Sequence, residues 1–192
     1  MSHDIDKMTR KSQEAMQAAA RSAEEAGHPQ VEPEHLLTEL VKQQDGLVPR
    51  ILEKSGLNPS ALLKSLKERL AKFPQVSGSN RIVASSRLEK VFKGAEVEAR
   101  TFGDSYISTE HFFLSTLKSD ASDLKNLFSK NGVKLAAIEK ATQDLRAGKK
   151  TMDEDPESKI EVLKKYARDL TQLAQEGKLD PVVGRDDEIR RV

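Results

Sequence analysis

Apolar residues recur along most of the chain at steps of three and four positions, the spacing that places side chains on one face of an α-helix. In the first segment this spacing runs from Ile5 to Ala23, and Gly27 is a suitable stop. Pro33 and Pro59 can each occupy a first helical turn, where the missing N–H is not needed. The predicted helices cover about residues 5–27, 33–44, 48–56, 59–70, 86–102, 109–118, 122–131 and 134–147.

A loop separates the fourth and fifth predicted helices. Pro74 to Asn80 contains the flexible tripeptide Ser77-Gly78-Ser79. The fifth helix is expected to open at Ser86, because Ser86-Arg87-Leu88-Glu89 fits a reciprocal capping box.

The helical pattern occurs twice. Residues 27–57 and 103–133 align at a constant offset of 76 positions, the separation between Glu34-His35 and Glu110-His111. Glycines and apolar positions recur together at this offset, which indicates a repeated backbone. We predict an all-α fold with two pseudo-symmetric four-helix repeats, at about residues 5–72 and 85–146, in one domain of residues 1–146. Stacked helical repeats create grooves, so this architecture favours binding over catalysis.

After residue 146 the composition changes. Residues 147–158 are polar and charged and include Gly148 and Pro156, which is typical of a flexible linker. Residues 159–192 have helical spacing again, and the last predicted helix reaches Val192 without a cap. We expect residues 159–192 to be the truncated start of a further domain, and the natural protein to continue.

Composition argues against several classes of protein. The 192 residues include 32 basic and 31 acidic ones, so the overall charge does not favour nucleic acid or a membrane surface as a partner. The chain has no cysteine, no apolar signal segment and no run of apolar residues long enough to span a membrane. These features fit a cytoplasmic location.

Little in the sequence suggests catalysis. The nearest approach to a phosphate-binding loop, Gly148-Lys149-Lys150-Thr151, lacks the earlier glycine and separates the lysine from the threonine. Each Glu-His dipeptide places its two side chains about 100° apart around a helix, which is a poor arrangement for chelating a metal. We therefore expect this chain to have no catalytic residue, no metal and no cofactor of its own.

The two Glu-His dipeptides allow two interpretations. In one, glutamate and histidine from different repeats form an acid–base pair. In the other, Glu34 and Glu110 lie in a first helical turn, where the positive end of the helix dipole favours them. His35 and His111 then pack, partly buried, at the interface between the repeats.

An apolar patch is expected around the turn at Gly103-Asp104. Phe102, Tyr106 and Ile107 lie beside the entrance to a predicted helix, where they could hold an extended apolar peptide. Alternatively, Ile107 packs back onto the helix that follows, as a hydrophobic staple. Both interpretations remain open from the sequence.

The repeat with its Glu-His pairs resembles the amino-terminal domain of the Clp family of AAA+ chaperones. Two further segments carry the resemblance: KFPQVSG at residues 72–78, and LKKYARDLTQLAQEGKLDPVVGRDDEIRRV at residues 163–192, which is similar to the entry into the first ATPase module. The resemblance spans essentially the whole chain. The two segments are most similar to the bacterial disaggregase branch of the family.

The resemblance implies that residues 1–146 bind unfolded or aggregated protein and deliver it to a hexameric ring, which threads it using ATP. Family positions for substrate binding fall on Thr9, Asp104 and Glu110. Gly94 and Glu98 stand where relatives tend to have leucines lining a groove, which puts the groove's character in doubt.

A rival function also follows from the resemblance. In protease-coupled relatives the paired glutamates, here Glu34 and Glu110, contact adaptors or phosphoarginine.

The remaining implications concern the full-length parent. The resemblance implies ATP and magnesium as its cofactors, a homohexamer as its assembly and a DnaK-type chaperone system as its partner. The present chain should be a monomer. The segment that borders the adenine in AAA+ modules corresponds to Val182, Val183, Gly184 and Arg185.

Overall fold

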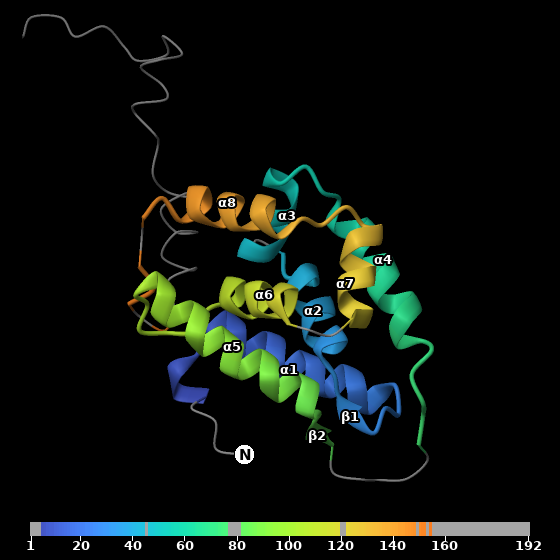
Figure 1. Ribbon diagram of the computed structural model, residues 1–192. Coiled ribbons are helices and arrows are strands. Elements are labelled where there is room, and N and C mark those ends of the chain that lie inside the picture. Colours follow the sequence, from blue (N-terminus) through green and yellow to red (C-terminus); the bar gives the residue numbers. More distant parts are fainter. Residues whose placement is uncertain are drawn as a thin grey trace, which may run out of the picture. The chain divides into compact units, whose positions relative to one another are not determined.

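The computed structural model describes residues 5–44, 46–76, 82–119, 122–148, 150–152 and 154. Within these residues the fold is all-α apart from two very short strands (Figure 1). The expected loop residues 77–80 and the whole of 159–192, including Val182 to Arg185, lie outside the described residues. The elements are the 3₁₀ turn Ile5–Lys7, α1 Arg10–Glu25, β1 Gln30–Val31, α2 Pro33–Lys42, α3 Leu47–Lys54, α4 Pro59–Leu70, β2 Val83–Ala84, α5 Ser86–Phe102, α6 Thr109–Lys118, α7 Ser122–Lys130 and α8 Leu135–Arg146.

All eight predicted helices are present; one helix start and one capping residue need correction. The first helix begins at Arg10 rather than Ile5, because Met8 and Thr9 are extended and Thr9 is the N-cap. The fifth helix is capped by Ser85, not Ser86: the Leu88 backbone N–H donates to Ser85 Oγ over 3.1 Å. Asn58 caps α4 as its sequence suggests, accepting from the Ser60 N–H at 2.9 Å.

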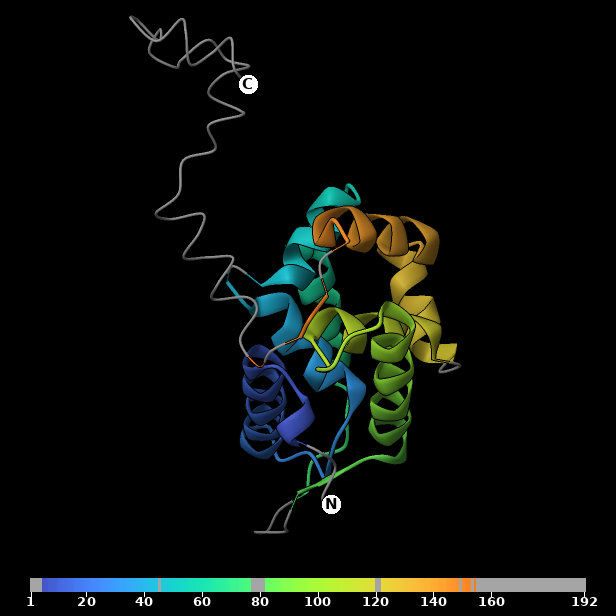
Figure 2. The same ribbon diagram turned by 90° about the vertical axis from the view of Figure 1, so that its left-hand side faces the viewer.

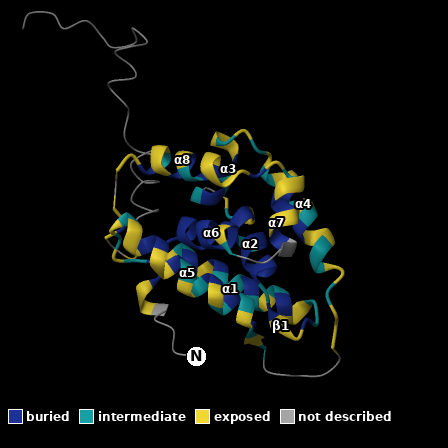
Figure 3. Ribbon diagram, in the orientation of Figure 1, coloured by how far each residue is buried: buried dark blue, intermediate teal, exposed yellow. Residues whose placement is uncertain are grey.

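The central helices are α2 and α6, the second helix of each repeat (Figure 1). Their apolar pairs Leu36-Leu37 and Phe112-Phe113 are completely buried. In Figure 2, α1 and α5 flank this central pair on its two sides, while α3, α4, α7 and α8 cover the other end. Exposed positions lie on the outer faces of the surrounding helices (Figure 3). The two repeats therefore share one core, as predicted.

Short extended segments of the two repeats also pair with one another, which the sequence did not predict. Val31 in β1 pairs in parallel with Ala84 in β2, just before α5. At the positions offset by 76, Met8 just before α1 pairs in parallel with Ile107 just before α6. The hydrogen bonds match: Thr9 N–H donates to the Ile107 carbonyl at 3.0 Å, and Ser85 N–H to the Val31 carbonyl at 3.0 Å. Each repeat thus binds the segment that precedes the first helix of the other repeat.

Glycines with left-handed backbone end corresponding helices in both repeats. Gly27 and Gly103 have φ of 67° and 70°, and Gly56 and Gly132 have φ of 76° and 72°. A residue with a Cβ is strained in this region. The recurrence of glycine at the offset of 76 therefore reflects a repeated backbone requirement.

Replacing Gly56 tests this requirement without a packing effect, because a Cβ there would meet nothing within 4 Å. Gly56→Ala is expected to lower the free energy of unfolding by about 1 kcal/mol, through backbone strain alone. Gly56→Asn should cost less, because asparagine tolerates the left-handed region. Urea denaturation followed by circular dichroism measures both. Equal stability of the alanine variant and the original protein would contradict the account.

Candidate functional site

The predicted substrate residues converge where the turn after α5 meets the start of α1. Gly103 ends α5, and Asp104 follows it directly. Ile107 then pairs with Met8, and its N–H donates to the Lys7 carbonyl at 2.7 Å. Residues from both ends of the domain are therefore brought together here.

Thr9 lies in this region, but its side chain is not available to a ligand. It is completely buried and caps α1, accepting from the Ser12 N–H at 3.4 Å and donating to Ser12 Oγ at 3.1 Å. That Thr9 binds substrate stays a prediction, and its hydroxyl here bonds to Ser12. Because Met8 pairs with Ile107, the capping side chain of Thr9 lies inside the domain.

Asp104 is likewise engaged inside the domain. Its side chain is inaccessible; Arg146 Nη2 donates to Oδ1 at 2.7 Å, and the Thr151 N–H donates to the same oxygen at 2.9 Å. His111 Nε2 lies 3.0 Å from Oδ2. Burial alone would raise the pKa of Asp104, but hydrogen bonds from His111, Arg146 and Thr151 outweigh it and lower that pKa to about 2. Asp104 therefore stays charged and anchors the turn instead of offering a free acceptor.

Glu110 belongs to the same buried cluster. Its Oε1 lies 3.2 Å from Arg146 Nη1, and the residue is 2% exposed. The Arg146 guanidinium also lies 4.6 Å from the centre of the Phe102 ring, a cation–π distance. Asp104, Glu110 and His111 could supply metal ligands by their spacing, but the Arg146 guanidinium already lies among them as the cation.

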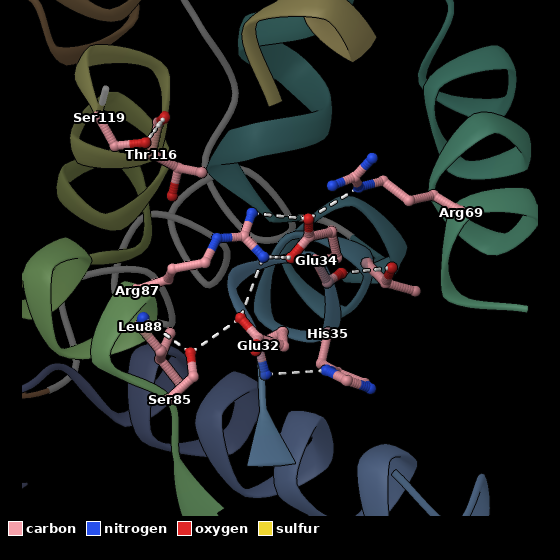
Figure 4. A network of polar contacts seen from close by, with 10 residues as sticks. Glu32, Glu34, His35, Arg69, Ser85, Arg87, Leu88, Thr116 and Ser119 are labelled. Atoms are coloured by element: carbon pink, nitrogen blue, oxygen red, sulfur yellow. Dashed lines mark hydrogen bonds and ion pairs between the residues drawn. The ribbon is translucent and has the colours of Figure 1, made fainter. Parts of the chain in front are cut away.

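Glu34 occupies the matching position in the first repeat and is also neutralised by arginine. Arg69 of α4 donates to Glu34 Oε1 at 2.8 Å, and Arg87 of α5 donates to both oxygens at 2.9 and 3.2 Å (Figure 4). Arg87 further contacts Glu32, which accepts from Ser85 Oγ at 2.8 Å. Glu34 and Glu110 are thus both buried against arginines of the chain itself. That these glutamates contact an adaptor or phosphoarginine stays a prediction, and both carboxylates are paired with arginines here.

The histidines of the Glu-His pairs have a capping role that the sequence analysis missed. His35 Nδ1 accepts from the Glu32 N–H, and His111 Nδ1 from the Ser108 N–H, each at 3.0 Å. Both rings are completely buried. The hydrogen-bond partners of each lie in its own repeat, and both rings are more deeply buried than expected. The recurring dipeptide could have suggested this role, because the third helical residue often caps its own helix.

The predicted glutamates do lie in the first turns of α2 and α6. Among the described contacts, neither Glu34 nor Glu110 reaches a histidine of the other repeat. The acid–base interpretation therefore finds no support in the geometry of the described residues.

The apolar patch is partly exposed. Phe102 and Tyr106 are half-buried, whereas Ile107 is buried in the core as the staple interpretation anticipated. Met152 is 60% exposed and lies beside the patch, its Sδ 3.6 Å from Ser105 Oγ.

Residues after α8 lie across this turn. The Thr151 carbonyl accepts from the Ser105 and Tyr106 N–H groups at 3.0 and 3.3 Å, and the Glu154 carbonyl accepts from the Arg10 N–H at 2.8 Å. Residues 150–152 and 154 are therefore attached to the domain, which corrects the expectation of a flexible linker starting at residue 147.

Gly94 and Glu98 do not line an open groove. A Cβ at Gly94 would lie 2.2 Å from Ser115 Oγ, so this glycine permits the close approach of α5 and α6. Glu98 is 8% exposed and binds Lys118 Nζ at 2.9 Å. Both residues serve helix packing.

The low pKa of Asp104 predicts a pH-dependent contribution to stability. The unfolded chain takes up the proton first, since its Asp104 has the ordinary pKa of 3.8 and the folded chain a pKa of about 2. The contribution is therefore complete above pH 4 and is lost as pH falls toward 2. Asp104→Asn should lower the free energy of unfolding at pH 6 by about 3 kcal/mol, because it breaks a buried ion pair, and the difference should shrink in acid.

The matched control for this prediction is Asp144→Asn. Asp144 is half-exposed and lies 3.8 Å from Lys54, so its loss should cost under about 1 kcal/mol. Urea denaturation between pH 6 and 3 compares the two variants. A cost of Asp104→Asn no larger than that of the control, or one independent of pH, would contradict the assignment.

Comparisons with known proteins agree with the fold. The profile of the Clp repeat (R) N-terminal domain matches residues 7–131. The "Chaperone protein ClpB" of Bdellovibrio bacteriovorus is 60% identical over 186 residues, covering 96% of this chain and 22% of that protein.

Solved structures show the same architecture at low identity. The Hsp104 N-terminal domain from Candida albicans superposes with a TM-score of 0.69 at 18% identity, covering 77% of this chain and 96% of that one. The ClpV N-domain in complex with a VipB peptide superposes with a TM-score of 0.61 at 21% identity, covering 75% and 89%. No helix among the described residues is long and apolar enough to cross a membrane. The chain belongs to the Clp repeat N-terminal domain family.

Proposed function

We propose that this domain is the substrate-engaging module of a disaggregase, which binds unfolded or aggregated polypeptide and delivers it to a ring-shaped motor. The observation that supports this most is the 60% identity to a ClpB chaperone over nearly the whole chain, a match that covers 22% of that protein. The chain spans about a fifth of the length of such relatives. Hexamer formation, ATP and magnesium, threading, a DnaK-type partner and a cytoplasmic location are therefore proposals for the parent protein.

The proposed contact surface is the turn at residues 102–106 together with Met152. It offers half-buried aromatic rings beside an exposed methionine, and such flexible apolar surfaces accept many sequences. The turn also binds extended backbone in this chain, since the Ser105 and Tyr106 N–H groups donate to the Thr151 carbonyl. An unfolded peptide can use the same kind of hydrogen bond.

The buried residues take part indirectly in this proposal. Thr9 fixes the start of α1, and Asp104 and Glu110 bind Arg146 beneath the Phe102 ring. They position the turn, and apolar contacts supply most of the affinity. Because a small surface that tolerates many sequences cannot use precise polar recognition, the dissociation constant should be roughly micromolar or weaker.

An NMR titration of the 192-residue chain with a reduced, carboxymethylated protein that cannot fold tests this proposal. Amide shifts are expected around residues 101–106 and 150–152. Tyr106→Ser should weaken binding about tenfold, because it removes one aromatic contact. The matched control is Val83→Ser, which removes a 43% exposed valine at the opposite end of α5. Shifts confined to the β1–β2 end, or equal losses in both variants, would overturn the proposed site.

A further inference from the structure

The first repeat contains an open pocket of about 230 Å³ between the end of α1, α2 and α4. It lies away from the turn discussed above. Apolar Ala26 and Leu70, the histidines His28 and His35, and two lysines, Lys42 and Lys67, contribute to its wall. Each of these residues has a counterpart in the second repeat at the offset of 76, which permits a direct comparison.

In the second repeat, the equivalent space is filled by the chain itself. Ala26 is replaced by Phe102 and Leu70 by Arg146, and these two side chains stack at 4.6 Å. Asp104 stands where the first repeat has His28, and binds the Arg146 guanidinium. The first repeat therefore has the same backbone walls without the side chains that close them.

The two sites also differ in charge. Around the filled site, carboxylates accompany both cations: Lys118 Nζ lies 2.9 Å from Glu98 Oε2, and Arg146 binds Asp104 and Glu110. The wall of the open pocket carries no carboxylate: the counterpart of Glu98 is Ser22, and the wall's charged groups are Lys42 and Lys67. The wall of the open pocket therefore lacks the carboxylates that accompany the cations of its counterpart.

The two lysines are not equivalent. Lys42 Nζ is 2.6 Å from Glu39 Oε1, so its charge is largely compensated at the rim. Lys67 has no ion pair among the described residues, and glutamine, Gln143, stands at its counterpart. Lys67 is thus the charge that an incoming ligand would meet.

The histidine pair adds a neutral donor. His35 Nδ1 accepts from the Glu32 N–H, so the proton of the neutral ring is on Nε2, which lies 2.8 Å from His28 Nδ1. His35 therefore donates to His28, and the remaining His28 proton is on Nε2. That nitrogen has no hydrogen-bond partner among the described residues. Phe73 packs against both rings, at 5.7 and 6.1 Å between centroids, and holds the pair in place.

We propose that this pocket binds a small oxyanion, a phosphate or carboxylate group with a short apolar attachment. Lys67 supplies the charge and the His28 Nε2–H a hydrogen bond. Lys42 contributes at the rim, and Ala26 and Leu70 accommodate the apolar part. Charge-assisted hydrogen bonds of this kind are stronger than those between neutral groups, which favours the anion over a neutral ligand.

The test is an NMR titration of the 192-residue chain with inorganic phosphate, phosphoserine and acetate in separate experiments. Shifts are expected at Ser22, His28 and Lys67, with saturation at roughly millimolar ligand. Tighter binding of phosphoserine than of inorganic phosphate would identify a phosphorylated side chain as the source. Saturation by acetate at a similar concentration would identify a carboxylate. Either result supports an oxyanion site.

Two variants reproduce the second repeat's chemistry and leave the core untouched, because Lys67→Gln and Ser22→Glu introduce the residues found at the counterparts. Lys67→Gln should weaken phosphate binding about tenfold, the effect of losing one charge-assisted hydrogen bond. Ser22→Glu should weaken it to a similar extent, because the added carboxylate repels the anion. The control is Lys64→Gln, an exposed α4 lysine outside the pocket, which should have no effect. Absence of saturable shifts with all three ligands, or equal weakening by Lys64→Gln, would overturn the proposal.

Discussion

The exchange of extended segments between the repeats determines where the other functional groups lie. Met8, just before α1, pairs with Ile107, just before α6. In the same way Ala84, just before α5, pairs with Val31, just before α2. The start of the first helix in each repeat is therefore bound to the start of the second helix in the other repeat. This pairing turns the caps Thr9 and Ser85 inward, where both are buried. It also brings Arg87, just inside α5, within reach of Glu34, just inside α2. A single backbone arrangement, used twice, thus creates both the shared core and the buried charges.

Buried carboxylates impose the next constraint. An uncompensated charge in the interior is costly, so each glutamate of the Glu-His pairs needs a cation nearby. The repeats meet this need differently: Glu34 has Arg69 and Arg87, whereas Glu110 has Arg146. At the offset of 76, Arg146 corresponds to Leu70 and not to Arg69. The arginine that compensates Glu110 therefore comes from a different position, and the space beside it differs between the repeats. In the second repeat the arginine fills that space; in the first it stays open beside the histidine pair.

The helices and the repeat could be predicted because both depend on local spacing. Gly27 and Gly103 mark the same left-handed turn, and periodic apolar positions mark the same buried faces. The burial of Thr9, Asp104 and Glu110 could not be predicted in this way, because it depends on partners distant in sequence. Arg146 is 42 positions from Asp104, and its counterpart in the first repeat is Leu70 and not an arginine. One relation links the two caps: Thr9 and Ser85 correspond at the offset of 76, but the sequence analysis placed the second cap at Ser86 and so did not relate it to Thr9.

The same burial bears on how such a domain can bind many partners. Charged groups that are satisfied internally cannot select a partner by its charge pattern, so what remains at the turn is aromatic and thioether surface. Every unfolded chain offers backbone carbonyls and apolar side chains to such a surface. In the function that we propose, the buried Asp104–Arg146 pair holds the turn in place, while it withholds the charges that would make recognition selective.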